Sequence, residues 1–83
     1  MKNTGKKILL KSGIKFRTSE LGYYDVWYPS MKEVCLVEDI VVTPVSTHKV
    51  SMKAGWIPCK VEPEVANQYG TQSRIIWILS GEE

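Results

Sequence analysis

The beginning of the chain alternates between apolar and polar residues with the period of a β-strand. From residue 7 to residue 17, in the sequence KILLKSGIKFR, the even positions are mostly apolar and the odd positions mostly basic. Successive side chains of a strand point to opposite faces, so this pattern predicts a strand with one face in the core and the other in solvent. Gly13 interrupts the run and predicts a bulge or a bend, because glycine weakens a regular strand and permits unusual backbone angles.

A second alternating segment follows a polar stretch. Residues 18–22 are polar and end in glycine, which predicts a hairpin loop of about five residues leading into a strand over residues 23–28. In that strand we expect Tyr24 and Val26 to face the core, because Asp25 marks the opposite, outer face. Residues 29–33 then predict a turn, although Ser30 and Glu33 have the spacing of a capping box and make a short helix the alternative.

The middle of the chain predicts short strands interrupted by prolines. Residues 34–37 and 40–42 are mostly β-favouring, with a polar turn at residues 38–39. Pro44 cannot donate to a strand ladder, so we expect its segment to lie at a sheet edge or a bulge. Residues 47–49 predict a turn, and residues 50–56 predict another half-buried strand whose end is marked by Pro58.

The last third of the chain predicts one helix and one strand. Residues 62–70 have Pro63 at the first helical position, acidic residues in the first turn and Gly70 just beyond the end, which predicts a helix of about two turns. The apolar run from residue 74 to residue 79 predicts a central strand that is buried on both faces.

Five or six short strands with one short helix near residues 63–69 indicate a mainly β protein. We expect a curled antiparallel sheet or a small barrel, SH3-like or OB-like in outline, with a small α+β fold as the alternative. No residue motif of the SH3-like family is present. A chain of 83 residues is expected to form a single domain over 1–83, because ordinary domains run to about 100–150 residues.

Charge is distributed unevenly along a chain whose net charge is only +2. Residues 1–17 contain six basic residues and no acidic one, and the remainder contains five basic and nine acidic residues. Such a basic end contacts a polyanion, an acidic protein surface or the acidic remainder of its own fold. No apolar run approaches the roughly 18 residues of a membrane span, and a signal-peptide pattern is absent. We therefore expect a cytoplasmic protein with no membrane partner.

The residue types that carry most protein chemistry are few. Cys35 and Cys59 are separated by 24 positions with the single histidine, His48, between them, which does not match the paired ligands of a zinc site. We expect two small buried thiols, with a disulfide or a reactive site as alternatives, and a solvated turn histidine. No nucleophile–base signature, carboxylate pair or phosphate-binding glycine loop is present, so we predict no enzyme activity, no metal and no cofactor.

The first hairpin provides the candidate binding surface. If even-numbered side chains of both strands share the core, odd-numbered side chains share the outer face. We predict a register that pairs Arg17 with Tyr23, Lys15 with Asp25 and Gly13 with Trp27. The outer face then carries a basic and aromatic patch, with Asp25 inside it and Lys7 at its far end. The predicted partner-binding residues are Lys15, Arg17, Tyr23 and Trp27, with Lys11 in second rank.

This patch has three interpretations. Tyrosine, tryptophan and arginine are enriched at the hot spots of protein interfaces, which favours a larger protein partner with an acidic surface. Aromatic faces that stack on unpaired bases beside basic residues that track phosphates are typical of single-stranded RNA or DNA binders, the alternative function. In the third interpretation, other elements cover the patch and its aromatic residues belong to the core. We predict a small interaction module that binds, inhibits or tethers a larger protein.

Overall fold

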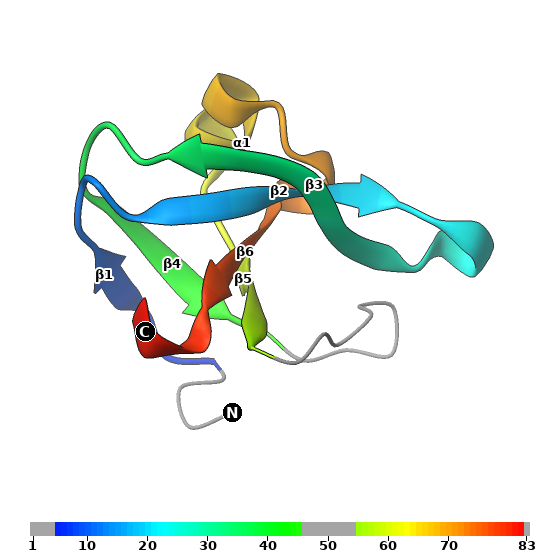
Figure 1. Ribbon diagram of the computed structural model, residues 1–83, viewed down its shortest axis with the longest axis horizontal. Coiled ribbons are helices and arrows are strands. Elements are labelled where there is room, and N and C mark those ends of the chain that lie inside the picture. Colours follow the sequence, from blue (N-terminus) through cyan, green and yellow to red (C-terminus); the bar gives the residue numbers. More distant parts are fainter. Residues whose placement is uncertain (1–4, 46–54, 83) are drawn as a thin grey trace.

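A computed structural model describes residues 5–45 and 55–82 and shows an antiparallel sheet of six strands that curls on itself (Figure 1). The strands are β1 (Ile8–Leu10), β2 (Lys15–Leu21), β3 (Trp27–Cys35), β4 (Ile40–Pro44), β5 (Trp56–Lys60) and β6 (Ile75–Leu79), with the helix α1 (Pro63–Tyr69) before the last strand. The strand order is β1-β4-β5-β6-β2-β3. The predicted fold class, a mainly β protein with a curled antiparallel sheet and one short helix, is confirmed. The turn predicted at 47–49 and most of the strand predicted at 50–56 lie outside the described residues.

The predicted first strand is two strands separated by a bend at Gly13. Gly13 has a φ of +92°, a left-handed conformation that glycine adopts without cost. Its N–H donates to the carbonyl of Leu36, and the N–H of Leu36 donates to the carbonyl of Ile14. This bend directs β1 toward β4 and β2 toward β6 and β3. The predicted alternation is confirmed, since Leu10 and Phe16 on the even face are fully buried.

Strands β2 and β3 form the predicted hairpin, but the predicted loop and register are wrong. β2 continues through Leu21, which pairs with Trp27, so the loop consists of residues 22–26. At the other end of the hairpin Lys15 pairs with Cys35 rather than with Asp25. Odd-numbered residues of β2 still lie opposite odd-numbered residues of β3. The prediction that odd-numbered side chains of both strands share one face therefore holds, although the loop lies further along the chain.

Two of the polar residues that suggested a loop at residues 18–22, Thr18 and Ser19, are buried and hydrogen-bonded within the sheet. The hydroxyl of Thr18 lies 2.9 Å from that of Ser30 on β3. The hydroxyl of Ser19 accepts a hydrogen bond of 2.6 Å from the indole N–H of Trp77 on β6. Buried polar groups are tolerated when they have partners. These partners are distant in sequence, so local polarity alone gave the wrong loop.

The turn predicted at residues 29–33 is also wrong, because these residues continue β3. β3 is the last strand of the sheet, so the side that faces away from β2 has no neighbour within the described residues. The N–H of Gly22 donates to the carbonyl of Val26. Along an antiparallel pair, residues that bond to the partner strand alternate with residues whose backbone N–H and C=O point away from it. Counted from Val26, Pro29 is a residue whose backbone points away from β2, toward the open side. A proline is tolerated there because no N–H is required of it.

Two further prolines, Pro44 and Pro58, lie inside the sheet. Pro44 is the last residue of β4, which lies between β1 and β5 rather than at the predicted edge. Pro58, which we expected to end a strand, lies in the middle of β5 opposite Trp77. The carbonyl of Pro58 accepts the N–H of Val45, so this side of the backbone remains paired without a proline N–H.

The helix and the last strand lie as predicted. α1 begins with Pro63 and ends before Gly70, which adopts the left-handed conformation with a φ of +67°. Tyr69 of α1 packs edge-on against Phe16 of β2 with ring centroids 5.0 Å apart. The four residues 75–78 of β6 are buried, which confirms a central strand covered on both faces. One core includes Phe16 and Ile76, and a second, smaller cluster contains Trp77 and Ile75 with Trp56 and Val45 packed against it.

Candidate functional site

The hairpin of β2 and β3 ends in a tight turn with an unusual sequence. The N–H of Val26 donates to the carbonyl of Tyr23 over 3.2 Å, and the two central residues, Tyr24 and Asp25, both have a φ of 60°. These are the features of a type I′ turn, whose twist suits a two-residue hairpin connection and whose usual sequence is Asn-Gly. A left-handed conformation costs an ordinary L-residue about 1–2 kcal/mol. The left-handed backbone of Tyr24 therefore lowers the stability of the folded protein.

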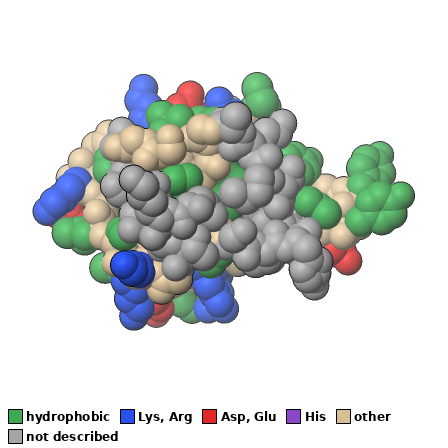
Figure 2. Space-filling model, turned by 90° about the horizontal axis from the view of Figure 1, so that it is seen from below, with side chains coloured by type: hydrophobic (Ala, Val, Ile, Leu, Met, Phe, Trp, Pro, Cys, Tyr) green, Lys and Arg blue, Asp and Glu red, His purple; other side chains and the backbone are tan. Residues whose placement is uncertain are grey.

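The end of this hairpin projects from the body of the molecule (Figure 1). It carries exposed apolar and aromatic side chains. Tyr23 and Tyr24 are 90% and 96% exposed, Leu21 is 47% exposed, and Trp27 opposite it is half-buried. We call these four residues the aromatic tip. Hydrophobic side chains gather at this projecting end in Figure 2, on the right, with an acidic group beside them. Residues 18–31 contain Glu20 and Asp25 but no lysine or arginine, so the hairpin end that carries the aromatic tip contributes negative charge.

The base of the aromatic tip is held by a tyrosine that packs against a glycine. A Cβ atom placed on Gly22 would lie 2.6 Å from Cε1 of Tyr28 and 2.9 Å from its Cδ1. Only glycine leaves room for the ring at this distance, and an aromatic ring over a glycine is a known way to stabilise a strand pair. We expected this arrangement between Trp27 and Gly13, but the structure has it between Tyr28 and Gly22.

The structure brings together two of the five predicted partner-binding residues and separates the other three from them. Tyr23 and Trp27 both belong to the aromatic tip. Lys15 lies at the opposite end of β2, six residues before Leu21, a separation of about 20 Å along an extended strand. The single basic and aromatic patch is therefore wrong, because it depended on a register that the sheet does not adopt. The binding roles of the individual residues remain predictions.

Arg17 is engaged by its own fold. Its guanidinium carbon lies 4.8 Å from the centre of the Trp56 ring, and its Nη1 donates to the carbonyl of Ser30 over 3.4 Å. Nε of Arg17 is buried and has no hydrogen-bond partner among the described residues. These contacts join β2, β3 and β5 on the face opposite the main core. A cation over a tryptophan ring contributes about 0.5–2 kcal/mol, so Arg17 has a structural role here.

Lys11 lies near the bend between β1 and β2. Its Nζ is 3.7 Å from a carboxylate oxygen of Asp39, and the other oxygen of Asp39 accepts the N–H of Ser12 over 2.8 Å. Part of the basic end therefore contacts the acidic remainder of the same fold, one of the three uses expected for it. The exposed lysines in this region are Lys6, Lys7, Lys11 and Lys15.

Two residues of the aromatic tip were missed by sequence reasoning. Tyr24 was expected in the core but is almost fully exposed, because the turn and not a strand contains it. Leu21 was assigned to a loop but is the last residue of β2. A signal was present in the tyrosine pair that directly follows Gly22 and precedes Asp25, since Gly and Asp are common in turns.

The cysteines differ from each other in exposure. Cys59 is buried in the main core, as expected. Cys35 is exposed at the end of β3 and carries a free thiol, so the expectation that both cysteines are buried is wrong for Cys35. Because the chain has only these two cysteines, the free thiol of Cys35 also rules out a disulfide between them. The neighbours of Cys35 in sequence are apolar, but it lies on the solvent side of the last strand.

Both edges of the sheet are poorly suited to pairing with a strand of another protein. β1 has only three residues. β3 is longer, but its pairing with β2 is irregular between Arg17 and Ser19, and Pro29 faces the open side. Short edge strands, bulges and prolines are the usual means by which proteins prevent strand addition. The aromatic tip, rather than an edge, is therefore the candidate functional site.

Comparison with protein-family models, with curated proteins and with solved structures found no match to this chain. Within the described residues no group of three or more His, Cys, Asp or Glu side chains is placed to hold a metal ion. No helix in the described part of the chain has the length and apolar character required to cross a membrane. His48 lies outside the described residues.

Proposed function

We propose that this protein is a small interaction module that binds a larger protein by inserting the aromatic tip into an apolar pocket of that partner. The observation that carries the proposal is the exposure of Tyr23 and Tyr24, 90% and 96%, at the end of a projecting hairpin. Tyrosine side chains bury a large area on binding and lose little rotamer freedom, which makes them frequent hot-spot residues. The module acts by occupying or bridging surfaces rather than by catalysis.

The conformation of the tip supports this proposal. Tyr24 and Asp25 both occupy left-handed backbone angles, which ordinary residues adopt only at a cost. Strained backbone that persists in a fold is concentrated at functional sites, and the inference from strain to function starts from an observed outlier. A turn held by the flanking strands also presents both rings without an ordering cost at the moment of binding.

The alternative, binding of single-stranded RNA or DNA, has less support at the aromatic tip. The exposed rings are suited to base stacking, but such binders also place lysine and arginine beside the stacked bases. The charged residues of segment 18–31 are Glu20 and Asp25, and the exposed lysines of the described residues lie outside this segment, at Lys6, Lys7, Lys11, Lys15, Lys32 and Lys60. Phosphates next to Tyr23 would therefore meet negative charge. The acidic partner surface predicted from the sequence concerns the basic end of the molecule and remains a prediction for that end.

The test compares three immobilised proteins in a lysate of the source cell: the wild type, a Tyr23→Ser, Tyr24→Ser double variant, and a Val37→Ser control. Val37 is 70% exposed and lies beyond the other end of the hairpin, so the control also removes exposed apolar surface. We expect quantitative mass spectrometry to find proteins that the wild type and the control retain and that the double variant loses by at least tenfold.

Two results would contradict the proposal. Equal retention of every captured protein by the double variant would remove the aromatic tip as the binding site. Capture that disappears after nuclease treatment and that falls steeply with salt would assign the surface to nucleic acid instead, because phosphate contacts make binding strongly salt-dependent. Melting temperatures of the three proteins should agree within a few degrees, because the exchanged side chains are exposed.

A further inference from the structure

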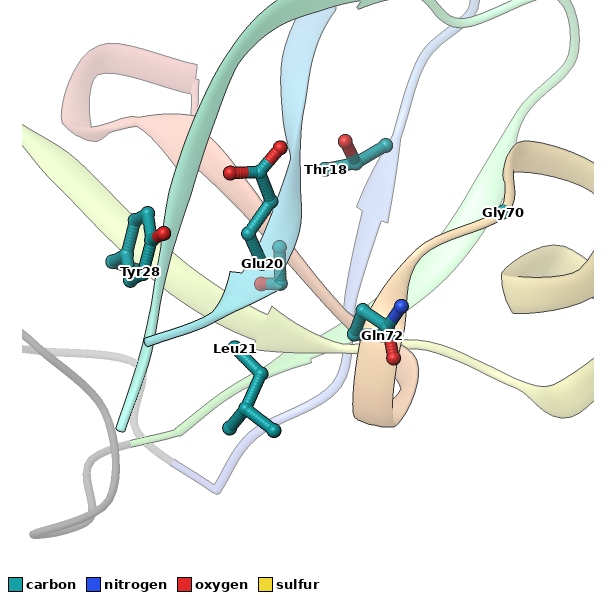
Figure 3. A pocket seen from close by; sticks show the side chains of 7 residues that line it. Thr18, Glu20, Leu21, Tyr28, Gly70 and Gln72 are labelled. Atoms are coloured by element: carbon teal, nitrogen blue, oxygen red, sulfur yellow. The ribbon is translucent and has the colours of Figure 1, made fainter. Parts of the chain in front are cut away.

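An open pocket lies directly beside the aromatic tip. Its volume is about 470 Å³, and it lies between the end of β2, Tyr28 of β3 and the connection from α1 to β6 (Figure 3). Glu20 and Tyr28 are opposite each other on the paired strands, and Gln72 lines the pocket from the connection before β6. We call this the Glu20 pocket. Its lining residues are Thr18, Ser19, Glu20, Leu21, Tyr28, Gly70 and Gln72.

The walls of the Glu20 pocket are fixed, but its one charged side chain is not engaged. Thr18 and Ser19 are buried, and their hydroxyls are occupied by Ser30 and by the indole of Trp77. The Ser19 N–H donates to the hydroxyl of Thr71. Within residues 5–45 and 55–82, by contrast, no hydrogen bond or salt bridge engages the exposed carboxylate of Glu20. A polar pocket lined by one carboxylate that is not engaged within the described residues is suited to a cation.

A second strained turn begins at Gln72, which lines this pocket. The N–H of Ile75 donates to the carbonyl of Gln72, and the residues between them, Ser73 and Arg74, have φ values of 49° and 58°. This turn therefore repeats the type I′ geometry of the aromatic tip with residues that do not favour it.

We propose that the Glu20 pocket receives the guanidinium group of an arginine side chain from the protein partner that the aromatic tip binds. The carboxylate of Glu20 accepts hydrogen bonds from the guanidinium, the aromatic ring of Tyr28 stacks on its plane, and the amide oxygen of Gln72 accepts a further N–H. Arginine fits better than lysine because its planar group combines paired hydrogen bonds to a carboxylate with stacking on an aromatic ring.

The inference rests on the proposed function, because the Glu20 pocket and the aromatic tip are continuous. Leu21 belongs to both, and the ring of Tyr28 that borders the pocket is packed against Gly22 at the base of the tip. A protein that buries Tyr23 and Tyr24 would therefore extend over the mouth of the Glu20 pocket. The partner surface that fits this end of the molecule is an apolar pocket with an arginine at its rim.

The first experiment uses the arginine group alone as a probe. The ¹⁵N-labelled protein is titrated with N-acetyl-arginine amide, and separately with N-acetyl-citrulline amide, which has nearly the same shape without the charge. We expect the arginine probe to shift the amide signals of Glu20, Tyr28 and Gln72 with a dissociation constant in the millimolar range, and the citrulline probe to shift them at least fivefold less at the same concentration. Equal shifts from both probes would overturn the proposal.

Variants test whether the carboxylate of Glu20 is the group that binds. Glu20→Gln should abolish the difference between the two probes, whereas Glu33→Gln should preserve it, because Glu33 is an exposed acid of the same hairpin outside the pocket. A difference that survives in Glu20→Gln, or that disappears in Glu33→Gln, would contradict the assignment. A folded spectrum of each variant shows that the result does not reflect unfolding.

A second experiment distinguishes failure of this inference from failure of the proposed function. Peptides are selected from a random display library on the wild type, on Glu20→Gln and on the Tyr23→Ser, Tyr24→Ser variant. We expect enrichment of arginine-containing peptides on the wild type, continued selection without arginine enrichment on Glu20→Gln, and no selection on the tip variant. Tip-dependent selection with no arginine preference would overturn the inference alone, and selection independent of the tip would overturn the proposed function.

Discussion

Replacement of the two central turn residues by the sequence that a type I′ turn favours should stabilise the protein while it weakens binding. The double substitution is Tyr24→Asn with Asp25→Gly. Asparagine adopts the left-handed conformation readily, so the first change removes a cost of about 1–2 kcal/mol. Because the side chain of Tyr24 is 96% exposed, its removal costs almost no buried surface.

The second change contributes less. Glycine removes the strain at Asp25, but it also increases the conformational freedom of the unfolded chain, which costs about 0.5–1 kcal/mol. The two effects at this position nearly cancel. The sum for both substitutions is a gain of about 1 kcal/mol in the free energy of unfolding. For a domain of this size, 1 kcal/mol corresponds to an increase in melting temperature of about 4–8 °C.

Thermal unfolding followed by circular dichroism measures this change, and two control variants make it specific. Tyr23→Asn removes an equally exposed tyrosine from a position without a positive φ, so its melting temperature should not rise. Ser73→Asn with Arg74→Gly should raise the melting temperature to a similar degree, because these residues also have a positive φ. A melting temperature that falls or stays constant for the Tyr24→Asn, Asp25→Gly variant would refute the claim that the turn is strained.

Three further outcomes are expected. Ser19→Ala should lower the free energy of unfolding by about 1–3 kcal/mol, because the indole N–H of Trp77 loses its acceptor in a buried site; chemical denaturation measures this, and an effect below 0.5 kcal/mol, the usual scatter of surface changes, would contradict it. Gly70→Ala should cost about 1 kcal/mol, because Gly70 ends α1 with a φ of +67°, and an unchanged denaturation midpoint would disprove this. Under native conditions a thiol reagent should modify Cys35 within minutes and Cys59 only after unfolding, as intact-mass spectrometry with peptide mapping can determine; equal labelling rates would contradict the burial of Cys59.

The elements that sequence reasoning located correctly are those with strong local signals. The helix was found from Pro63 and Gly70, which have preferred positions at the two ends of a helix. The central strand β6 was found from an unbroken apolar run, and the bend at Gly13 from a glycine within an alternating strand. These signals depend on the local backbone, so a single sequence is enough to reveal them.

The errors arose where a residue's environment is set by distant parts of the chain. Ser19 lies in a strand because Trp77, 58 positions later, supplies its hydrogen-bond partner. Pro29 lies in a strand because β3 is at the edge of the sheet, which local sequence does not specify. The parity of the hairpin faces survived these errors, because a displacement of the loop by an even number of residues keeps the same side chains on each face.

The candidate site depended on the register and therefore changed most. Tyr23 and Trp27 remained together because they are close in sequence at one end of the hairpin. Arg17 was separated from them by the length of β2 and is engaged by Trp56, a contact that no sequence pattern near Arg17 indicates. Tyr24 entered the site because it occupies a left-handed turn position that asparagine or glycine usually fills, so the usual Asn-Gly signal was absent.

The irregular edges of the sheet have a consequence for how this protein behaves at high concentration. A molecule with two uncovered tyrosines at the end of a β-hairpin is at risk of stacking with its own copies into fibrils, because exposed strands act as templates for identical strands. The brevity of β1 and the proline in β3 interrupt that template on both sides. The chain can therefore expose two tyrosines at the end of a hairpin and still resist self-assembly along its strands.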